Sequence, residues 1–566
     1  MMMSEKQDEY KQKLTEHLQE RVVSSDEGLD SRWKKITRTS HKTAEEVFGK
    51  TSRKQSNVWF DKECQDVTEG KNKAYSNMQQ QSYTRASTDK YREAQRKEKQ
   101  VHKRKKKQYE NNQIEKLEEL GQQNQIRQFY RDINKLRKGF KLRLTIYHFH
   151  EPLNGMEQEQ EPTKMQYCND THEEESLPTT EEVEMAVQKL KKHKAPGMDN
   201  VPAELLKYGG NEIIIHLHTI IKEILLTEKM PTDWNLSIIC PIHKTGDLME
   251  CSNYRGVSLL NTAYKMLCTI LFTRIPPFAE NIIENYQSGF RKNSSTVNQM
   301  FTLIQIREKA KEFGIETHHL FIDFRSAYNT IERVKLHSAM SEFNIPNELI
   351  RIIQMTMENT KSQVRIQSDL SDPIITKKGL RQGVSLVCLL FNLALQKVVR
   401  DTGIQTNGTI FYKSVQLLAY TDDIDTIARS PTALKEAFLS LERAARVMGL
   451  KINEEKTKYM TTRVTKNQPK YYQIEKFNFE TVQSFTYLGS LVDVKNDNSV
   501  EIRERLLLAN ECFDGLKRQF RSQLLPVKNK VKLYKTLIRP VLAHGSETLV
   551  LSKSDENILR TLKGKL

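Results

Sequence analysis

Three aspartates are the residues of this sequence best suited to metal chemistry. Asp422 and Asp423 are adjacent and follow the apolar residues 415–419, and Asp323 follows the apolar run 320–322. If two strands deliver these carboxylates to one place, they could hold a pair of divalent cations, as in-line phosphoryl transfer requires. Taken alone, a Tyr-x-Asp-Asp tetrapeptide is weak evidence, because adjacent aspartates are common in solvated turns.

The segments around these acids predict the strands that would position them. Residues 318–322 are apolar enough for a buried strand and a helix is expected from Ala327, so Asp323 is expected at the C-terminal end of a strand, where layered α/β folds collect ligands. Residues 415–419 and 424–428 predict two more strands, and the tight turn between them holds the other two carboxylates. Their apolar flanks favour cation binding, since buried carboxylates need a partner.

Five further residues are candidates for contacting a nucleotide. Tyr328 could lie beneath a nucleotide sugar and block or admit a 2′-hydroxyl, although a core aromatic is the commoner role for this residue type. Gly383 would let the backbone approach a base or sugar closely, and Gln382 offers an amide. Lys244 and Arg255 could neutralise a triphosphate, the arginine by a bidentate contact and the lysine as a point charge, although either alone is more often a surface cation.

The composition favours a polyanionic partner. Lys and Arg total 89 against 72 Asp and Glu, a net charge of +17, which fits nucleic acid; a protein with a basic tail is the alternative. The seven cysteines form no Cys-x-x-Cys pair, which argues against a disulfide framework and a zinc knuckle. The N-terminus is too polar for a signal peptide, and no apolar run approaches the roughly 18 residues of a membrane span. We therefore expect an intracellular protein, cytoplasmic or nuclear, that makes no contact with membranes.

An ordered series of short blocks resembles the reverse transcriptases of non-long-terminal-repeat (LINE-type) retrotransposons. The similarity spans roughly residues 180–495, with weaker similarity toward the C-terminus. Its order makes it far more specific than any single block. The blocks are residues 194–199, 201–204, 253–256, 287–291, 321–324, 379–383, 419–423, 449–453 with 456–457, and 485–489.

The resemblance implies an α+β fold: a right-hand polymerase with fingers, palm and thumb and an antiparallel palm sheet, preceded by a largely helical basic N-terminal region. It implies two Mg²⁺ ions per active site, with Mn²⁺ as an alternative, held by Asp323, Asp422 and Asp423. It also implies a catalytic role for Lys456, which matches a palm lysine that would protonate pyrophosphate. The implied nucleotide-binding residues are Lys244, Arg255, Tyr328, Gln382 and Gly383, and the implied primer grip is Phe485, Tyr487, Leu488 and Gly489.

The expected domains follow composition and the resemblance. Residues 1–150 are expected to form a helical basic connector, and 151–178 an acidic flexible linker. Residues 179–492 would be the fingers and palm, with a core reverse transcriptase domain at about 225–492, and residues 493–566 a truncated helical thumb. The densest basic run, residues 90–107, is either a phosphate-contacting arm or a solvated helix face.

The expected function is RNA-directed DNA synthesis: extension of a DNA 3′ end on an RNA template from deoxynucleoside triphosphates. The protein would act as a monomer or as a ribonucleoprotein with its own transcript. We expect a 5′-truncated reading frame without the endonuclease that the family usually encodes, because the charged first 180 residues do not predict a compact α/β domain. Ribonuclease H is not expected either.

Two alternatives to this function stay open: a catalytically inactive RNA-binding remnant of the same fold, and an enzyme that makes RNA on RNA. Departures from the family pattern bear on the first of them, although none removes a metal ligand. They are Asn329, Thr421, Val384, Val387 and Cys388.

Overall fold

The computed structural model describes residues 2–19, 28–49, 62–80, 85–122, 153, 176–244, 247, 253–366, 369–406, 408, 410–463 and 469–565. The chain divides into two compact units, each with a buried core. The first unit comprises Met1–Gly49, Leu142–Glu501 and Gly545–Leu551, and the second comprises Lys50–Lys141, Ile502–His544 and Ser552–Leu566.

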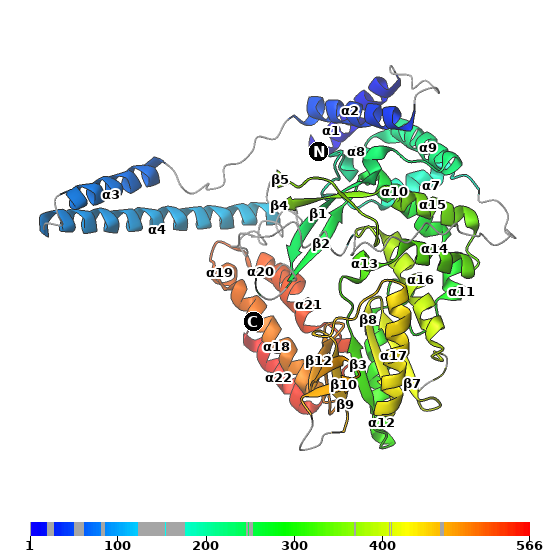
Figure 1. Ribbon diagram of the computed structural model, residues 1–566. Helices are drawn as coiled ribbons and strands as arrows, with labels where there is room; N and C mark the ends of the chain where they lie inside the picture. The colour runs from blue at the N-terminus through cyan, green and yellow to red at the C-terminus, as the bar shows by residue number, and fades with distance from the viewer. Residues whose placement is uncertain are drawn as a thin grey trace. The chain divides into compact units, whose positions relative to one another are not determined.

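A six-stranded sheet in the first unit carries the acidic turn (Figure 1). The strand order is β10-β11-β9-β3-β8-β7, and every pairing is antiparallel except the parallel pairing of β9 with β11. The antiparallel palm sheet that the resemblance implies is thus present with one parallel pair. The strands are β3 (His318–Ile322), β7 (Val415–Tyr420), β8 (Asp423–Ala428), β9 (Lys458–Thr461), β10 (Tyr471–Ile474) and β11 (Phe477–Thr481).

The two faces of this sheet belong to different hydrophobic clusters, because successive side chains of a strand point to opposite sides. Leu320 and Ile322 belong to the main core of the first unit, together with residues of α16 (Ser385–Thr402) and α17 (Pro431–Val447). Phe321 lies on the other face, in a smaller cluster with residues of α12 (Thr296–Glu312). Both faces are therefore covered, which explains why β3 is buried along its whole length.

A second sheet of the first unit is built on a long antiparallel hairpin. Its strands are β1 (Leu236–His243), β2 (Tyr254–Leu259), β4 (Lys361–Ile366), β5 (Asp369–Leu370) and β6 (Ile374–Ile375), and β1 also pairs with β4 in parallel. A separate two-stranded hairpin consists of β12 (Ser484–Tyr487) and β13 (Ser490–Asp493).

Helices supply the rest of the first unit. Thr179 and Glu182 form a capping box at the start of α7. Besides α12, α16 and α17, the helices between α7 and the β12–β13 hairpin are α7 (Thr180–Lys189), α8 (Ala203–Lys207), α9 (Gly210–Thr227), η1 (Thr232–Asn235), α10 (Thr262–Arg274), α11 (Pro276–Ile282), α13 (Ala327–Thr330), α14 (Arg333–Glu342) and α15 (Asn347–Met357). A short helix η4 (Ser546–Thr548) also belongs to this unit.

The N-terminal helices α1 (Met2–Gln19) and α2 (Leu29–Phe48) are part of the first unit and not of a separate connector. Tyr10 and Trp33 are fully buried in its core, and the Trp33 ring meets Trp234 edge-on at 5.4 Å. Arg32 also pairs with Glu223 of α9. The compact units therefore divide the chain differently from the expected boundary at residue 150, because the basic composition of this region hid a buried helix face.

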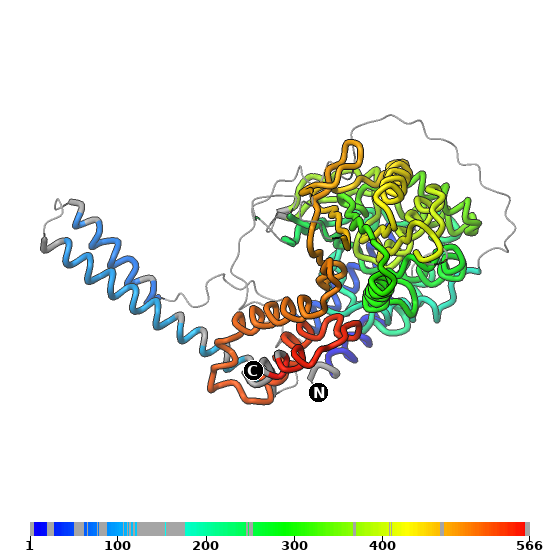
Figure 2. Tube along the Cα trace, turned by 90° about the horizontal axis from the view of Figure 1, so that it is seen from below, coloured from blue at the N-terminus to red at the C-terminus, as the bar shows by residue number. Residues whose placement is uncertain are grey.

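The second unit is helical in its described part. The helices α3 (Lys62–Gln80) and α4 (Arg85–Gln122) lie side by side as a long pair (Figure 2). The other helices are α19 (Lys517–Arg521), α20 (Val527–Leu533), a π-helical turn η3 (Tyr534–Ile538), α21 (Arg539–Leu542) and α22 (Lys553–Lys565), while α18 (Asn498–Gly515) begins in the first unit and continues in the second. Among the described helices, none is long and apolar enough to cross a membrane. Of the expected linker at 151–178, only Leu153 and residues 176–178 lie within the described residues.

Candidate active site

Strand pairing brings the three aspartates to one edge of the six-stranded sheet. Ile322 of β3 pairs with Ile424 of β8, so the antiparallel register sets Asp323 opposite Asp423 one step further on. Residues directly opposite in such a pair have Cβ atoms about 4.5–5.5 Å apart. Asp422 belongs to the turn between β7 and β8, directly before Asp423. The prediction that two strand ends would deliver these acids to one place is therefore confirmed.

A buried glutamine fixes the turn that carries two of these acids. Thr421 has a left-handed backbone with φ 57°, which is unfavourable for a β-branched residue. Gln287 accepts a hydrogen bond from the Thr421 N–H at 2.8 Å and donates one to the Thr421 carbonyl at 3.2 Å. The Gln287 side chain is 1% exposed. The Gln287 side chain thus binds both the N–H and the carbonyl of Thr421.

Gln287 was missed as a functional residue in the sequence. It stands in the block 287–291 that carries part of the resemblance, but nothing in its type or spacing indicates a contact with a turn 134 residues away. Gly289 shows the same close packing, because a Cβ at this position would lie 2.5 Å from the Thr421 nitrogen. The glycine is therefore required for the approach of this loop to the acidic turn.

The electrostatics of the three carboxylates show that they act on one another. Burial raises the pKa of Asp323 and of Asp422, and the charges of Lys244 and, for Asp422, of Arg255 oppose this rise. Asp423 keeps an exposed surface, but partial burial and then the charges of Asp422 and Asp323 raise its pKa to about 6. Burial thus disfavours the charged form of all three acids, and for Asp422 and Asp423 the neighbouring carboxylates add to this effect.

An open hollow of about 370 Å³ lies against two of the acids. Asp323 and Asp423 form part of its wall, and Lys456 lies in the same wall and lowers the pKa of Asp323 against the larger effect of burial. The other lining residues are Phe321, Ile322, Ile424, Glu455, Lys458, Phe485, Thr486 and Tyr487.

The β12–β13 hairpin forms one side of this hollow and is locked onto the sheet. The ring of Phe485 stacks on Phe321 with centroids 4.4 Å apart, and the Tyr487 hydroxyl donates to the Asp423 carbonyl at 3.5 Å. Leu488 and Gly489 both have positive φ, as the two central residues of a type I′ hairpin turn require. Phe485 and Tyr487 therefore face the site, whereas Leu488 and Gly489 shape the turn.

None of the expected nucleotide residues lines the hollow, and three of them, Lys244, Arg255 and Tyr328, interact electrostatically with the acidic turn. Exposed Lys244 and Arg255 stand on the β1–β2 hairpin and act electrostatically on Asp422 and Asp423. Tyr328 is 7% exposed and packs on Phe391 at 4.7 Å. Burial raises its pKa first, and the Asp422 charge adds to the rise, so this core aromatic also borders the acidic turn.

Gln382 and Gly383 are the last residues of the loop 378–383, which lies against strand β2 at Gly383. Gln382 is half-buried, and Gly383 has φ 125° with the Ser258 carbonyl 3.0 Å from where a Cβ would stand. The close neighbour of the backbone at Gly383 is thus strand β2, and the expected approach to a base or sugar stays a prediction.

Comparison with known proteins agrees with this geometry. Residues 242–492 match the family described as reverse transcriptase (RNA-dependent DNA polymerase). This match covers both strand ends with their aspartates, the β1–β2 hairpin from residue 242 on, and the β12–β13 hairpin up to residue 492. Residues 242–492 therefore resemble a reverse transcriptase domain, and the relatives that the chain matches are RNA-directed DNA polymerases of transposons.

The relatives of the chain include RNA-directed DNA polymerases of insect transposons. The chain is 25% identical over 378 residues to the probable RNA-directed DNA polymerase from transposon X-element of Drosophila melanogaster, a match that covers 65% of this chain and 41% of that protein. It is 24% identical to the RNA-directed DNA polymerase from mobile element jockey of Drosophila funebris, covering 69% of this chain and 43% of that one. The chain thus spans less than half the length of these relatives.

One solved structure also resembles the chain. An apo telomerase from Candida tropicalis, truncated from its C-terminal domain, covers 52% of this chain and 67% of its own, with 12% identity and a TM-score of 0.36. The family match and the mixed, largely antiparallel sheet agree with the expected α+β right-hand fold.

The donor chemistry of the three aspartates suits a hard divalent cation. Carboxylate oxygens are the ligands that Mg²⁺ prefers, and burial raises the pKa of Asp323, Asp422 and Asp423, an effect that a bound cation would oppose. No group of three or more His, Cys, Asp or Glu side chains in a metal-holding arrangement occurs among the described residues. The three aspartates thus suit such an ion by donor type, but their side chains do not form a metal-holding arrangement in the described structure.

Proposed function

We propose that the chain is an RNA-directed DNA polymerase that extends a DNA 3′ end on an RNA template. The observation that carries this proposal is the meeting of Asp323 with Asp422 and Asp423 at one strand edge, inside the region that matches reverse transcriptases. Two Mg²⁺ ions bound by these carboxylates would favour loss of the 3′-hydroxyl proton and stabilise charge on the triphosphate. Mn²⁺ is the alternative ion.

The chain's own residues would bind and orient the nucleotide. Lys244 and Arg255 on the β1–β2 hairpin carry the positive charge nearest the acidic turn, so they would hold the triphosphate. Tyr328 borders the same turn and is fixed by its contact with Phe391, so its ring would form a rigid wall beside the sugar. Gln382 would contact the base or the template from the adjoining loop.

The hollow would receive the growing end of the primer. Phe485 and Tyr487 line it from the hairpin, and the Phe321 stack keeps this hairpin at a fixed distance from Asp423. Leu488 and Gly489 would complete the grip through the turn. Lys456 lies in the same wall, where its Nζ would donate a proton to the pyrophosphate leaving group.

The proposed partners are an RNA template, a DNA primer and deoxynucleoside triphosphates, with the protein acting inside the cell as a monomer or bound to its own transcript. A catalytically inactive RNA-binding remnant is the second candidate. The observation that favours it is Thr421, a β-branched residue in a left-handed conformation within the acidic turn.

Primer extension separates these functions. The full chain is incubated with Mg²⁺, oligo(dT) annealed to poly(rA), and either dTTP or UTP. The proposal predicts extension with dTTP well above that with UTP. Binding of the template without extension would instead support the inactive remnant, and a preference for UTP would support synthesis of RNA.

A further inference from the structure

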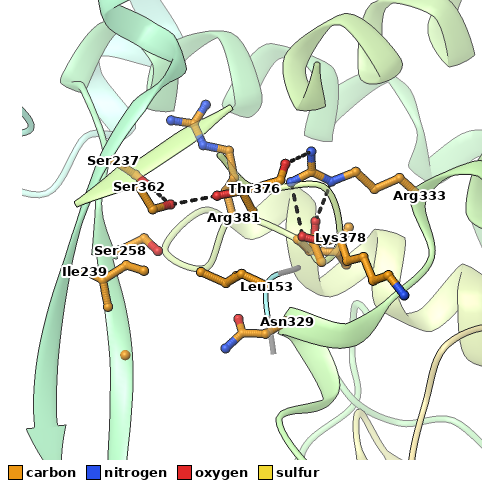
Figure 3. A pocket seen from close by; sticks show the side chains of 13 residues that line it. Leu153, Ser237, Ile239, Ser258, Asn329, Arg333, Ser362, Thr376, Lys378 and Arg381 are labelled. Carbon is orange, nitrogen blue, oxygen red and sulfur yellow. Dashed lines mark hydrogen bonds between the residues drawn. The ribbon is translucent and has the colours of Figure 1, made fainter. Parts of the chain in front are cut away.

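The nucleotide loop, residues 378–383, is held by two arginines that have no carboxylate partner in the described part of the chain. Arg381 belongs to the loop itself, and Arg333 begins helix α14. Figure 3 shows both beside a small pocket where only about 20 Å³ remains open. Leu153 enters the same pocket and accepts a hydrogen bond from the Lys378 N–H at 3.1 Å.

Arg333 donates hydrogen bonds to oxygen atoms within the loop and outside it. Its Nε donates to the Gly379 carbonyl at 2.9 Å and its Nη2 to the Lys378 carbonyl at 3.3 Å, both within the loop. Its Nη1 donates to the Thr360 hydroxyl and to the Thr376 carbonyl, each at 3.0 Å, and also to the Met357 carbonyl. One side chain thus joins the loop to the end of α15 and to the strands that follow it.

Arg381 anchors the other end of the loop to the start of β1. The side chain is 7% exposed, and its Nη2 donates to the Trp234 carbonyl at 2.8 Å and to the Leu236 carbonyl at 3.2 Å. Its guanidinium lies over the Tyr264 ring at 4.3 Å. Two of its nitrogens, Nε and Nη1, are buried without a hydrogen-bond partner among the described residues.

Burying two arginines in this way is energetically unfavourable if their role is only structural. A buried cation without a carboxylate loses hydration that carbonyl acceptors only partly replace. Burial and then the nearby charge of Arg381 lower the pKa of Arg333 to about 10. Lysine could not substitute for either residue, because it lacks the planar set of five donors that reaches several carbonyls at once.

Hydrogen bonds connect the loop to the backbone of Tyr328, the proposed sugar contact. The Leu380 N–H donates to the Tyr328 carbonyl at 2.7 Å, and the Gly379 N–H donates to the Ile331 carbonyl at 2.8 Å. A Cβ at Gly379, where φ is 77°, would stand 2.5 Å from the Asn329 carbonyl oxygen. The loop therefore lies flush against the backbone that carries Tyr328, and Gln382 follows directly after Arg381.

We propose that Arg333 and Arg381 are positioning residues that hold the nucleotide loop against Tyr328 and thereby set nucleotide affinity and sugar discrimination. This inference rests on the proposed polymerase function. It assigns the two arginines to nucleotide selection and not to the chemical step, because neither contacts the aspartates.

The test compares R381K and R333K with the wild-type full chain in primer extension. The expected result is a rise of about tenfold in the KM for dTTP, equivalent to about 1.4 kcal/mol, with kcat within about twofold of the wild type. Incorporation of UTP relative to dTTP should also rise. R32K is the matched control. Arg32 is also a buried arginine whose Nε has no hydrogen-bond partner among the described residues, and its Nη2 pairs with Glu223 away from the loop. R32K should lower thermal stability without changing KM.

Amide hydrogen exchange in the protein without nucleotide gives a readout that needs no activity. The Gly379 and Leu380 amides should exchange faster in R381K and R333K and at the wild-type rate in R32K. Unchanged exchange and unchanged KM in both variants would overturn the inference, as would an equal rise of KM in R32K. If the wild-type chain extends no primer, the proposed function fails, while the exchange rates still decide the role of the arginines.

Discussion

Thr421 shows how single residues support the chemistry without touching the reacting atoms. Its left-handed backbone is held by Gln287 on both its N–H and its carbonyl, and Gly289 leaves room for the approach. Such a conformation costs on the order of 1–3 kcal/mol outside glycine and persists where the surroundings over-determine it. Gln287 is thus expected to act through the orientation of Asp422 and Asp423.

Replacing Gln287 with methionine should lower kcat for primer extension by about tenfold or more, since neither hydrogen bond to the turn can then form. Steady-state kinetics of Q287M would measure this. The control is Q396M, because Gln396 is also fully buried and contacts Glu284 at 3.2 Å and 2.9 Å with both ends of its amide. Equal kcat in Q287M and the wild type would show that the turn keeps its geometry without the glutamine.

At this scale the sequence indicated the candidate metal ligands and their meeting at one strand edge, but not the residues that support them. The aspartates were recognisable because acids after apolar runs are chemically unusual and their blocks have a known order. Gln287, Arg333 and Arg381 are ordinary polar residues whose importance depends on burial and on contacts across long stretches of sequence. Such contacts follow from tertiary packing, which residue type and spacing do not specify.

At the scale of elements, the β12–β13 hairpin connects the sheet to the proposed primer site. Its own two strands are too short for independent stability, so its position depends on the aromatic stack between Phe485 and Phe321. The turn residues Leu488 and Gly489 supply the positive φ values that let so short a hairpin close.

Replacing Phe485 with alanine should therefore weaken binding of the primer terminus, because the hairpin is then no longer stacked on the sheet. The expected result is a Kd for poly(rA)/oligo(dT) raised by several-fold, or about 1 kcal/mol, measured by fluorescence anisotropy. Y471A is the control, since Tyr471 is a half-exposed aromatic on β10 that does not line the hollow. Equal affinity for F485A and the wild type would remove the hairpin from the primer site.

Asp199 gives a pH-dependent prediction in the loop before α8. Burial raises its pKa from 3.8 to about 6, and its Oδ2 is buried without a partner among the described residues. Because the folded state binds the proton more tightly than the unfolded state, this group destabilises the fold above pH 6, and the effect disappears as pH falls toward 4. Asp199→Asn should therefore add about 1–2 kcal/mol to the free energy of unfolding at pH 7.

Denaturant unfolding at pH 7 and at pH 4 would measure this difference. The gain from D199N should shrink to near zero at pH 4, because the wild-type carboxyl is then protonated in the folded state. A gain that is equal at both pH values would mean that the buried charge is not its cause.

At the scale of the whole molecule, the basic N-terminal part has two different roles. Helices α1 and α2 contribute buried residues, Tyr10, Leu14, Trp33 and Ile36, to the core of the first unit. The α3–α4 pair belongs to the second unit and exposes most of its cations along α4. The described exposed cations of α4 are Lys90, Arg92, Arg96, Lys97, Lys99, Lys103, Arg104, Lys107 and Lys116. Composition alone could not separate the two parts, because both are rich in charge.

Removing residues 62–110 should weaken RNA binding and flatten its salt dependence, whereas removing residues 2–49 should unfold the first unit. For every phosphate that the protein no longer neutralises, the negative slope of log K against log salt becomes shallower by about 0.7 on single strands. Titration of a labelled poly(rA) at several salt concentrations would measure this. A triple variant, Lys97→Gln, Lys99→Gln and Lys103→Gln, keeps the helices and removes only charge. If its salt dependence matches that of the wild type, these three cations of α4 are solvated and do not contact RNA.

The central claim is that the three aspartates at one strand edge catalyse DNA synthesis on RNA. The measurement that tests it most directly compares wild-type chain with D422N in Mg²⁺-dependent extension of oligo(dT) on poly(rA). Asparagine keeps the size of the side chain but removes the negative charge of a metal ligand. We predict extension by the wild type and none by D422N, with thermal stability no lower than that of the wild type and equal RNA affinity. Extension by D422N at the wild-type rate would contradict the account.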